Sequence, residues 1–485
     1  MLSEALDARE QAQRRALGSN SWRFLQRPSV SMLLLAGAIL FAGLSQGDIR
    51  IDGPIYAWAA KHMLISGDWL NLYYDHGQTP YFNKPPLQFW LMALTFKALG
   101  YSTFSAKIVS VLFGLGCIAM VYAIARLRFE PAIAATAGIV LATTYSFIRN
   151  TAAVRLEAGV TFFFLVALYA GARMLLSPEQ RLAHWMILGA ACGLALMIKS
   201  GVVLLCLPIL AAAFAWNRRW DLLLNWRASI AIIVCASVVL PWYLHQYHTW
   251  GQAFIDQHFR NQMLGRLESS TFGSSSWYAY LQDLTTRYWW FLLGLFGAYK
   301  IIRERSSAAE HARICERLLL IWAFGSLLLL HLLPRKYDRY LLLVYPALAI
   351  LVAYGLSRTP LWGAWKSRLL PHLGWFSLVV AISLQSSGVR LHATAYPELA
   401  RAIPAINQAP GGAIYAVDTI PIPLQCSIRF FSNVRVLPIH TITLPNLRPD
   451  DILVVPRQFT EPLPPHRTIA EGRNVSFMWL SRVEN

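Results

Sequence analysis

Residues 48–90 read DIRIDGPIYAWAAKHMLISGDWLNLYYDHGQTPYFNKPPLQFW, and we expect the rest of the chain to be arranged around this stretch. It follows an apolar segment, residues 29–44, whose length is close to the minimum for crossing a bilayer. The stretch itself carries the acids Asp52 and Asp68, the cation Lys84 and a Pro-Pro pair. Polar residues directly after an apolar segment predict a loop that lies beside a membrane.

The composition of the whole chain also indicates a membrane protein. Of its 485 residues 56% are apolar and only 14% are charged, which is a strong departure from soluble domains. The formal charge of +18 is compatible with Lys and Arg in cytoplasmic loops and near lipid head groups. We therefore expect membrane lipids, and no nucleic acid, as partners. The six cysteines are scattered and show neither a disulfide framework nor zinc spacing.

Apolar segments recur along the chain and predict an all-α polytopic membrane protein with about 11 transmembrane helices. Residues 1–28 are rich in arginine and are expected to form a cytoplasmic tail, followed by a transmembrane domain over residues 29–386 with its first external loop at 47–105. The expected helices lie near residues 29–44, 106–126, 131–148, 158–176, 184–198, 202–216, 228–244, 287–302, 316–333, 340–356 and 369–386.

Residues 87–99 are apolar but short, and Gln88 and Lys97 interrupt them. If this segment crossed the membrane, all later loops would change sides and most of the Lys and Arg in loops would lie outside. The positive-inside rule therefore favours a juxtamembrane helix on the outer surface. Charged groups at helix ends then share the side opposite the amino terminus, as one cavity at the membrane surface requires. These groups are Asp52, Arg155, Glu157, Lys199 and residues 334–339.

Residues 387–485 differ in character from the rest of the chain. They are polar and contain short β-like runs, AIYAV, VRVLPI and DILVV, which Pro and Asn turns separate. This pattern predicts a small soluble C-terminal α/β domain. The odd number of expected helices puts the domain on the outer side of the membrane, and no motif in it indicates chemistry of its own.

The opening stretch resembles the first external loop of the C-type superfamily of glycosyltransferases that use lipid-linked sugars. The shared order is an acid, a Tyr, a short amphipathic helix, Ser-Gly-Asp-Trp and Tyr-Phe-x-Lys-Pro-Pro. The chain is most similar to the bacterial members related to the protein O-mannosyltransferases and to the aminoarabinose transferases of lipid A, over roughly residues 45–350.

This resemblance implies an integral membrane glycosyltransferase of the bacterial inner membrane. A hexosyl or pentosyl group would pass from a polyprenyl-phosphate donor to a lipid, polysaccharide or protein acceptor. The active site and the C-terminal domain would be periplasmic. The identity of the sugar, the identity of the acceptor and the stereochemistry of transfer are not readable from the residues.

The resemblance implies that Asp52 and Glu157 are the catalytic acids. Glu157 stands where the family has an Arg-x-Asp pattern at a helix start, here beginning with Arg155. One carboxylate would accept the acceptor's proton, and the other would orient a cation or a sugar hydroxyl. The alternative for Glu157 is an acid that only stabilises the helix dipole.

A lipid phosphate leaving group needs compact cations held in a dry site. Lys84 precedes two prolines that fix the backbone, Lys199-Ser200-Gly201 resembles the family's Lys-Gly turn, and residues 336–340 resemble its Lys-x-x-x-Tyr helix start. For each Arg or Lys the alternative is a helix-end cation that extends to the head groups. The candidate phosphate-binding residues are Lys84, Arg155, Lys199, Lys336, Arg339 and Tyr340, and the candidate substrate-binding residues are Tyr56, Tyr81 and Arg266.

Two departures from the family pattern bear on cofactors. Gly53 stands where many relatives have Glu, and Asn83 replaces the Glu that the aminoarabinose transferases associate with a bound metal ion. A neutral amide is a poor substitute for a carboxylate ligand. No cofactor is therefore firmly indicated, and a divalent metal stays open, with His258 and Asp52 as weak candidate ligands.

A second class of function also stays open. The chain would then be a non-catalytic polytopic protein, a transporter or an assembly partner in the biogenesis of envelope polysaccharide. The acids together with the Lys-Pro-Pro motif favour the enzyme, because a non-enzyme has no need for the combination.

Overall fold

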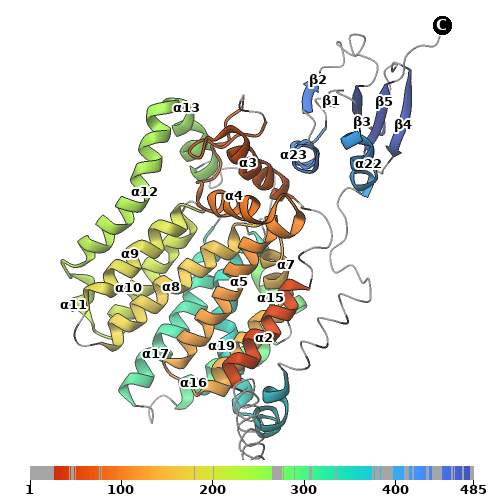
Figure 1. Ribbon diagram of the computed structural model, residues 1–485. Helices are drawn as coiled ribbons and strands as arrows, with labels where there is room; N and C mark the ends of the chain where they lie inside the picture. The colour runs from red at the N-terminus through yellow and green to blue at the C-terminus, as the bar shows by residue number, and fades with distance from the viewer. Residues whose placement is uncertain are drawn as a thin grey trace, which may run out of the picture.

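Most of the described chain is helical, and a bundle of helices carries a small sheet near one end (Figure 1). The computed structural model describes residues 27–42, 44, 49, 51–75, 77, 79–177, 179, 181–199, 201–264, 276, 278–288, 290–304, 309–333, 336–373, 376, 379, 383, 397–408, 414–417, 420–432, 436–439, 451–459, 463, 465–471 and 475–480.

The bundle consists of apolar helices whose small residues allow close packing. For example, a Cβ atom added to Gly297 would overlap the carbonyl oxygen of Leu351 on the neighbouring helix. The helices of the bundle are α2 (Pro28–Phe41), α5 (Thr103–Arg126), α6 (Pro131–Ala142), α8 (Glu157–Leu176), α9 (Leu182–Leu196), α10 (Cys206–Trp216), α12 (Ala228–Trp250), α16 (Phe291–Glu304), α17 (Glu310–Leu320), α18 (Ser326–His331) and α19 (Tyr345–Ser357).

Shorter helical pieces connect or extend these helices. They are α7 (Tyr145–Thr151), η1 (Val202–Leu205), α11 (Trp220–Leu223), α13 (Gln252–Phe254), η2 (Ile255–Leu264), α15 (Ala279–Arg287), η4 (Ile321–Gly325), η5 (Asp338–Leu343), α20 (Trp362–Ala364), η6 (Trp365–Leu369) and η7 (Leu370–His372).

The expected number of about 11 membrane spans is not confirmed. Four continuous helical segments in the described part of the chain are long and apolar enough to cross a membrane: Thr103–Arg126, Glu157–Leu176, Trp220–Gln262 and Glu310–His331. Several other expected spans form apolar helices of only 10–17 residues. The last expected span, residues 369–386, lies largely outside the described residues.

The expected span at residues 131–148 is not one straight helix. It is divided into α6 and α7, which are bent by 68° relative to each other and count as a fifth span only if they are taken together. At the break, the hydroxyl groups of Thr143 and Thr144 donate to the carbonyl groups of Ile139 and Val140. Such side-chain hydrogen bonds compete with the helix ladder, and Thr144 has an extended backbone.

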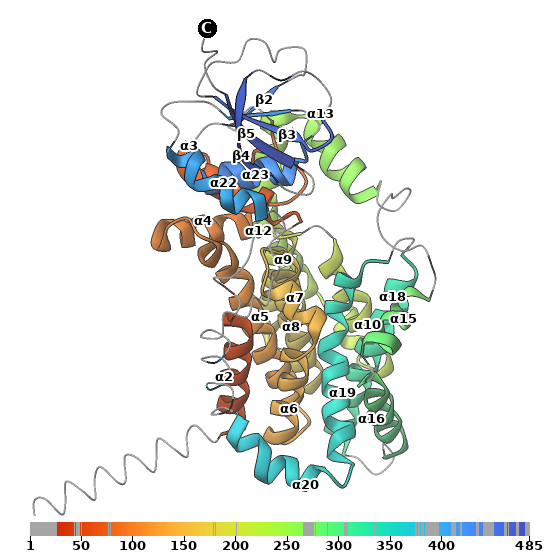
Figure 2. The same cartoon turned by 90° about the vertical axis from the view of Figure 1, so that its right-hand side faces the viewer.

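Two helices, α3 (Gly53–Ser66) and α4 (Leu87–Leu99), lie at the end of the bundle that faces the sheet (Figure 1). Figure 2 shows α4 running across this end, whereas α5 and α19 run along the length of the bundle. This is the orientation that we expect of residues 87–99 if they form a helix on the membrane surface. The loop between α3 and α4 contains Lys84 and is held at the same end.

The small C-terminal sheet is confirmed, and the three β-like runs form its first three strands. The parallel strands β2, β1 and β3 are extended by the antiparallel strands β5 and β4, in the order β2-β1-β3-β5-β4. The domain has an apolar core of its own. Its elements are α22 (Pro397–Gln408), β1 (Ile414–Val417), α23 (Ile422–Phe431), β2 (Val436–Ile439), β3 (Ile452–Pro456), β4 (His466–Glu471) and β5 (Val475–Leu480).

Candidate active site

A cavity of about 90 Å³ lies where the start of α3, the loop before α4, the start of α8, the end of α9 and the start of η5 meet. Segments that are far apart in the sequence thus supply one wall each. Most of the candidate residues meet here. The lining residues are Asp52, Ile55, Tyr56, Tyr74, Tyr81, Asn83, Lys84, Leu156, Glu157, Lys199 and Arg339.

Asp52 lies at the amino-terminal end of α3, but its side chain makes no capping hydrogen bond to that helix. The carboxylate is therefore not used by the helix end and faces the cavity as one of its lining groups. The next residue is a glycine because space is short: a Cβ atom on Gly53 would lie 2.7 Å from the Ile49 side chain and 3.1 Å from that of Val154.

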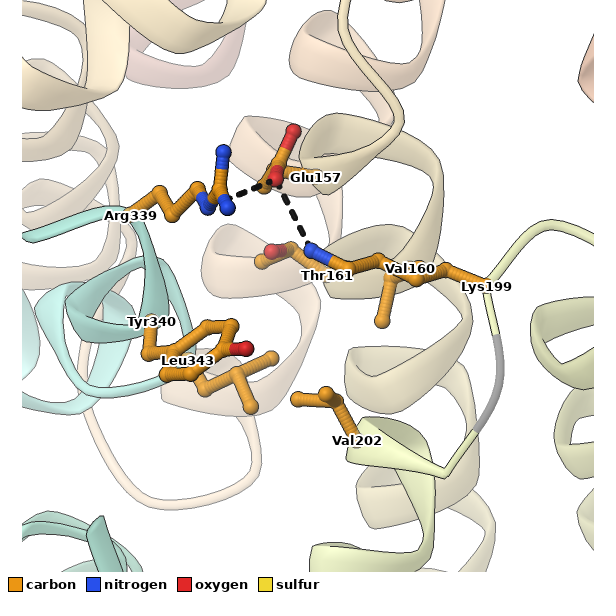
Figure 3. A pocket seen from close by; sticks show the side chains of 8 residues that line it. All are labelled: Glu157, Val160, Thr161, Lys199, Val202, Arg339, Tyr340 and Leu343. Atoms are coloured by element: carbon orange, nitrogen blue, oxygen red, sulfur yellow. Dashed lines mark hydrogen bonds and ion pairs between the residues drawn. The ribbon is translucent and has the colours of Figure 1, made fainter. Parts of the chain in front are cut away.

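Glu157 begins α8 and is only 8% exposed. Figure 3 shows its carboxylate between two cations: the Lys199 ammonium donates to it at 2.9 Å, and Nε of Arg339 lies 3.5 Å from the same oxygen. A buried carboxylate is costly unless it is paired, and two cations neutralise this one. Glu157 therefore does more than stabilise the helix dipole.

Lys199 reaches Glu157 from a tight turn at the end of α9. Gly201 has a φ of 82°, which a residue with a side chain rarely adopts, so the predicted Lys-Gly turn has a physical reason. The ammonium group also lies 5.3 Å from the centre of the Tyr340 ring. Tyr340 lines a smaller adjoining space together with Glu157, Lys199 and Arg339 (Figure 3).

Three tyrosines, Tyr56, Tyr74 and Tyr81, form a further part of the cavity wall. The ring centres of Tyr74 and Tyr81 are 4.8 Å apart, and those of Tyr56 and Tyr81 are 6.4 Å apart. Burial, and then the charge of Asp52, raise the pKa of Tyr56 well above its usual value. Burial likewise raises the pKa of Tyr81 well above its usual value and that of Tyr74 to about 12. All three hydroxyl groups thus stay protonated and are able to donate hydrogen bonds.

Lys84 lies on the loop before α4, and its ammonium donates to the Asn83 carbonyl at 2.9 Å. His258 links this loop to α12: its Nδ1 lies 2.6 Å from the Phe82 carbonyl oxygen, and its Nε2 lies 3.1 Å from the Tyr243 hydroxyl. Because both ring nitrogens are occupied, His258 is a structural histidine, and its candidacy as a metal ligand is not supported.

The residues of the cavity do not fit a metal ion. The amide of Asn83 donates to the Tyr74 hydroxyl at 3.0 Å and accepts from Gln257 at 3.1 Å, so it holds the wall together. Within the described ranges, no group of three or more His, Cys, Asp or Glu is arranged to bind a metal. Of the two carboxylates in the cavity, Glu157 is already paired with Lys199 and Arg339, which leaves Asp52, and hard divalent cations take several oxygen ligands.

Three other candidate residues are placed differently. Lys336 lines a separate polar cavity of about 440 Å³, beside an ion pair of 3.3 Å between Arg149 and Asp338. Arg155 does not line the central cavity, but its backbone carbonyl accepts from Gln88 at 2.7 Å and fixes the chain before Glu157. Arg266 lies outside the described residues.

Sequence reasoning missed Tyr74 and the apolar residues Ile55 and Leu156 of the cavity wall. Ile55 is three residues after Asp52, on the same face of α3, so helical periodicity is the signal that would have found it. Leu156 directly precedes Glu157. Tyr74 carries no local signal, because only the return of the loop between α3 and α4 brings it to the cavity.

Comparisons with known proteins confirm the predicted resemblance. Residues 83–245 match the family described as dolichyl-phosphate-mannose-protein mannosyltransferase. The undecaprenyl phosphate-alpha-4-amino-4-deoxy-L-arabinose arabinosyl transferase of Pseudomonas paraeruginosa is 31% identical over an alignment of 251 residues, which covers 48% of this chain and 44% of that protein. The corresponding transferase of Pseudomonas savastanoi pv. phaseolicola is 27% identical over 310 residues, 62% of this chain and 56% of that protein. The matched part thus spans about half the length of these relatives.

The fold is shared with solved membrane glycosyltransferases. ArnT from Cupriavidus metallidurans, bound to undecaprenyl phosphate, superimposes with a TM-score of 0.74 at 17% identity, over 92% of this chain and 97% of that one. The oligosaccharyltransferase AglB from Archaeoglobus fulgidus, in complex with an inhibitory peptide and a dolichol-phosphate, superimposes with a TM-score of 0.54 at 13% identity, over 84% and 64%. The small sheet at the end of the helical bundle is therefore part of an ArnT-like fold.

Proposed function

We propose that this chain is an integral membrane glycosyltransferase that transfers a sugar from a polyprenyl-phosphate donor to a lipid, polysaccharide or protein acceptor. The observation that carries the proposal is the cavity in which Asp52 faces the cations Lys84, Lys199 and Arg339. An acid for the acceptor and cations for the leaving phosphate are the two requirements of such a transfer.

Asp52 and Glu157 have different roles because their hydrogen-bond and ion-pair partners differ. Asp52 makes no capping hydrogen bond, so its carboxylate is the one available to accept a proton from the acceptor hydroxyl. Glu157 is already neutralised by Lys199 and Arg339, which makes it a poor base. Its role is to hold these two cations at the cavity.

The cations receive the phosphate end of the donor. Three cationic side chains face two carboxylates in the cavity, so the site has a net positive charge that suits a phosphate group. When the bond between the sugar and the phosphate breaks, these cations stabilise the charge that develops on the lipid phosphate. The protonated hydroxyl groups of the tyrosine wall are placed to donate to the sugar or to the phosphate.

We assign undecaprenyl phosphate as the carrier lipid and a pentosyl or hexosyl group as the sugar, supported by the named activities of the relatives. The protein would work in the bacterial inner membrane, with the cavity and the C-terminal domain on the periplasmic side. This chemistry needs no nucleotide sugar, because the donor arrives already activated on its lipid.

The test is transfer of labelled sugar from undecaprenyl-phosphate donors by the purified chain in detergent, with envelope glycolipids as acceptors. General-base catalysis is worth roughly 10² to 10⁴ in rate, so Asp52→Asn should lose about that factor while it remains folded. Asp256→Asn, which changes a partly exposed acid paired with Arg260, is the matched control and should keep its rate. Equal transfer rates for Asp52→Asn and Asp256→Asn would contradict the assignment of Asp52 as the base. If the unchanged chain transfers no sugar, the result would favour a non-catalytic protein.

The role of the cations can be tested by comparing lysines of the central cavity with a lysine of the neighbouring cavity. Lys84→Ala and Lys199→Ala each remove a cation from the central cavity, whereas Lys336→Ala removes one from the neighbouring cavity. We expect Lys84→Ala and Lys199→Ala to raise KM for the donor, or to lower kcat, by at least tenfold. A factor of this size corresponds to the loss of one hydrogen bond to a charged group. A larger loss in Lys336→Ala than in the other two would move the phosphate site to the neighbouring cavity.

A further inference from the structure

The C-terminal domain is attached to the site by one of its helices, α23, which packs on α3 (Figures 1 and 2). One face of α23 belongs to the domain's own core through Leu424 and Ile428. The other face contributes Cys426 and Phe430 to the core of the helical bundle. The helix is thus shared between two cores, and its position relative to α3 is fixed by apolar packing.

Lys61 of α3 reinforces this attachment at the carboxyl end of α23. Its ammonium group donates to the carbonyl oxygens of Arg429, Phe430 and Ser432, at 3.1, 2.8 and 3.2 Å. The last carbonyl groups of a helix have no partners within the helix, and a cation is favourable at that end of the helix dipole. An ammonium has three donors, and here all three are used although the side chain is only 5% exposed.

The same helix also holds the cavity wall. The guanidinium of Arg429 donates to the backbone carbonyl of Tyr74 at 3.2 Å, and the thiol of Cys426 donates to the same carbonyl at 3.5 Å. The hydroxyl of Tyr74 in turn accepts from Asn83, and its ring packs against Tyr81. Tyr74, Asn83 and Tyr81 all line the central cavity.

We infer that Lys61 and Arg429 are positioning residues through which the C-terminal domain fixes Tyr74, and with it the tyrosine wall of the cavity. This inference rests on the proposed function for its catalytic consequence. None of the residues that line the cavity comes from the described part of this domain. The domain supplies the fixed partner that the loop between α3 and α4 needs in order to present Tyr74 and Asn83 to the substrate.

The first measurement is hydrogen exchange of backbone amides in the full-length chain without substrate. Lys61→Met keeps the length of the side chain but removes its hydrogen-bond donors. Amide exchange should become roughly tenfold faster both in α23 and in residues 70–83, because a tenfold change corresponds to the loss of a charged hydrogen bond. Lys61→Arg should restore most of the protection. Lys97→Met, which changes an exposed lysine on α4, is the control and should leave both segments unchanged.

A second variant separates attachment of the domain from positioning of the loop. Arg429→Met removes the hydrogen bond to Tyr74 but leaves the carbonyl groups that accept from Lys61, so exchange should rise in residues 70–83 more than in α23. In the transfer assay, both Lys61→Met and Arg429→Met should raise KM for the donor or the acceptor, with a smaller change in kcat.

Unchanged exchange of residues 70–83 in both variants would overturn the inference, whatever the activity. Faster exchange with unchanged transfer kinetics would also overturn the positioning role. If the unchanged chain transfers no sugar, the proposed function fails, yet the exchange experiment still reports whether the domain holds the loop.

Discussion

At the scale of single residues, the site depends on how each charge is partnered. Glu157 lies between Lys199 and Arg339, and breaking a buried ion pair by removing one partner costs about 3 to 5 kcal/mol because the other charges stay buried. Glu157→Gln should therefore lower both the stability and the transfer rate. Glu157→Asp keeps the charge with a shorter reach and should retain partial activity. Thermal unfolding and sugar transfer in detergent measure the two effects, and a Gln variant that behaves like the unchanged chain would contradict the pairing.

The backbone next to the candidate base is strained. Ile51, directly before Asp52, has a φ of 57°, an unfavourable conformation for a β-branched residue, and its side chain is largely exposed. Ile51→Asn places a residue that tolerates this conformation and should stabilise the fold by about 1 kcal/mol. Ile51→Val keeps the strain and is the control. Chemical unfolding measures the difference, and no gain of Asn over Val would show that the strain is absent in solution.

At the scale of elements, the turn after α3 is held by Asp68. Partial burial disfavours the ionised form of Asp68 and by itself would raise its pKa. Hydrogen bonds from Asn71, from the Leu70 amide and from Tyr73 outweigh this effect and lower the pKa of Asp68. A carboxyl group whose pKa is lowered by folding stabilises the folded state above its unfolded pKa of about 3.9. This contribution is lost as the pH falls through the lower, folded pKa.

Asp68→Asn should therefore destabilise the chain at pH 6, and the difference from the unchanged chain should shrink as the pH falls below about 3.9. Unfolding measured between pH 6 and pH 3 tests this expectation. Asp256→Asn removes an exposed ion pair and should show little difference at any pH in that range. A difference for Asp68→Asn that does not change with pH would mean that its charge is unimportant to the turn.

At the scale of the whole molecule, the side of the membrane on which the cavity lies depends on α4. The helix runs across the end of the bundle (Figure 2), as the distribution of Lys and Arg in the loops predicts. We expect the carboxyl terminus on the periplasmic side. A reporter that is active only in the cytoplasm should stay silent when fused after Asn485, and a reporter active only in the periplasm should respond. The opposite result would put the cavity on the cytoplasmic side.

The sequence by itself determined the membrane class, the small C-terminal sheet and most residues of the cavity. Asp52, Lys84 and Lys199 were found because each lies in a short motif that resembles a motif of the glycosyltransferase family, and all three line the cavity. The number of spans was not determined, since hydropathy does not detect a break such as the one at Thr144, where side-chain hydroxyl groups capture the backbone.

Only the tertiary structure decided the partners of these residues. It placed Glu157 between two cations, occupied both nitrogens of His258 and put Lys336 in a neighbouring cavity. It also joined Lys61 to carbonyl groups more than 360 residues away in the chain. The physical reason is that a local pattern sets the backbone and exposes a side chain, whereas hydrogen bonds and ion pairs between distant segments depend on how the helices pack.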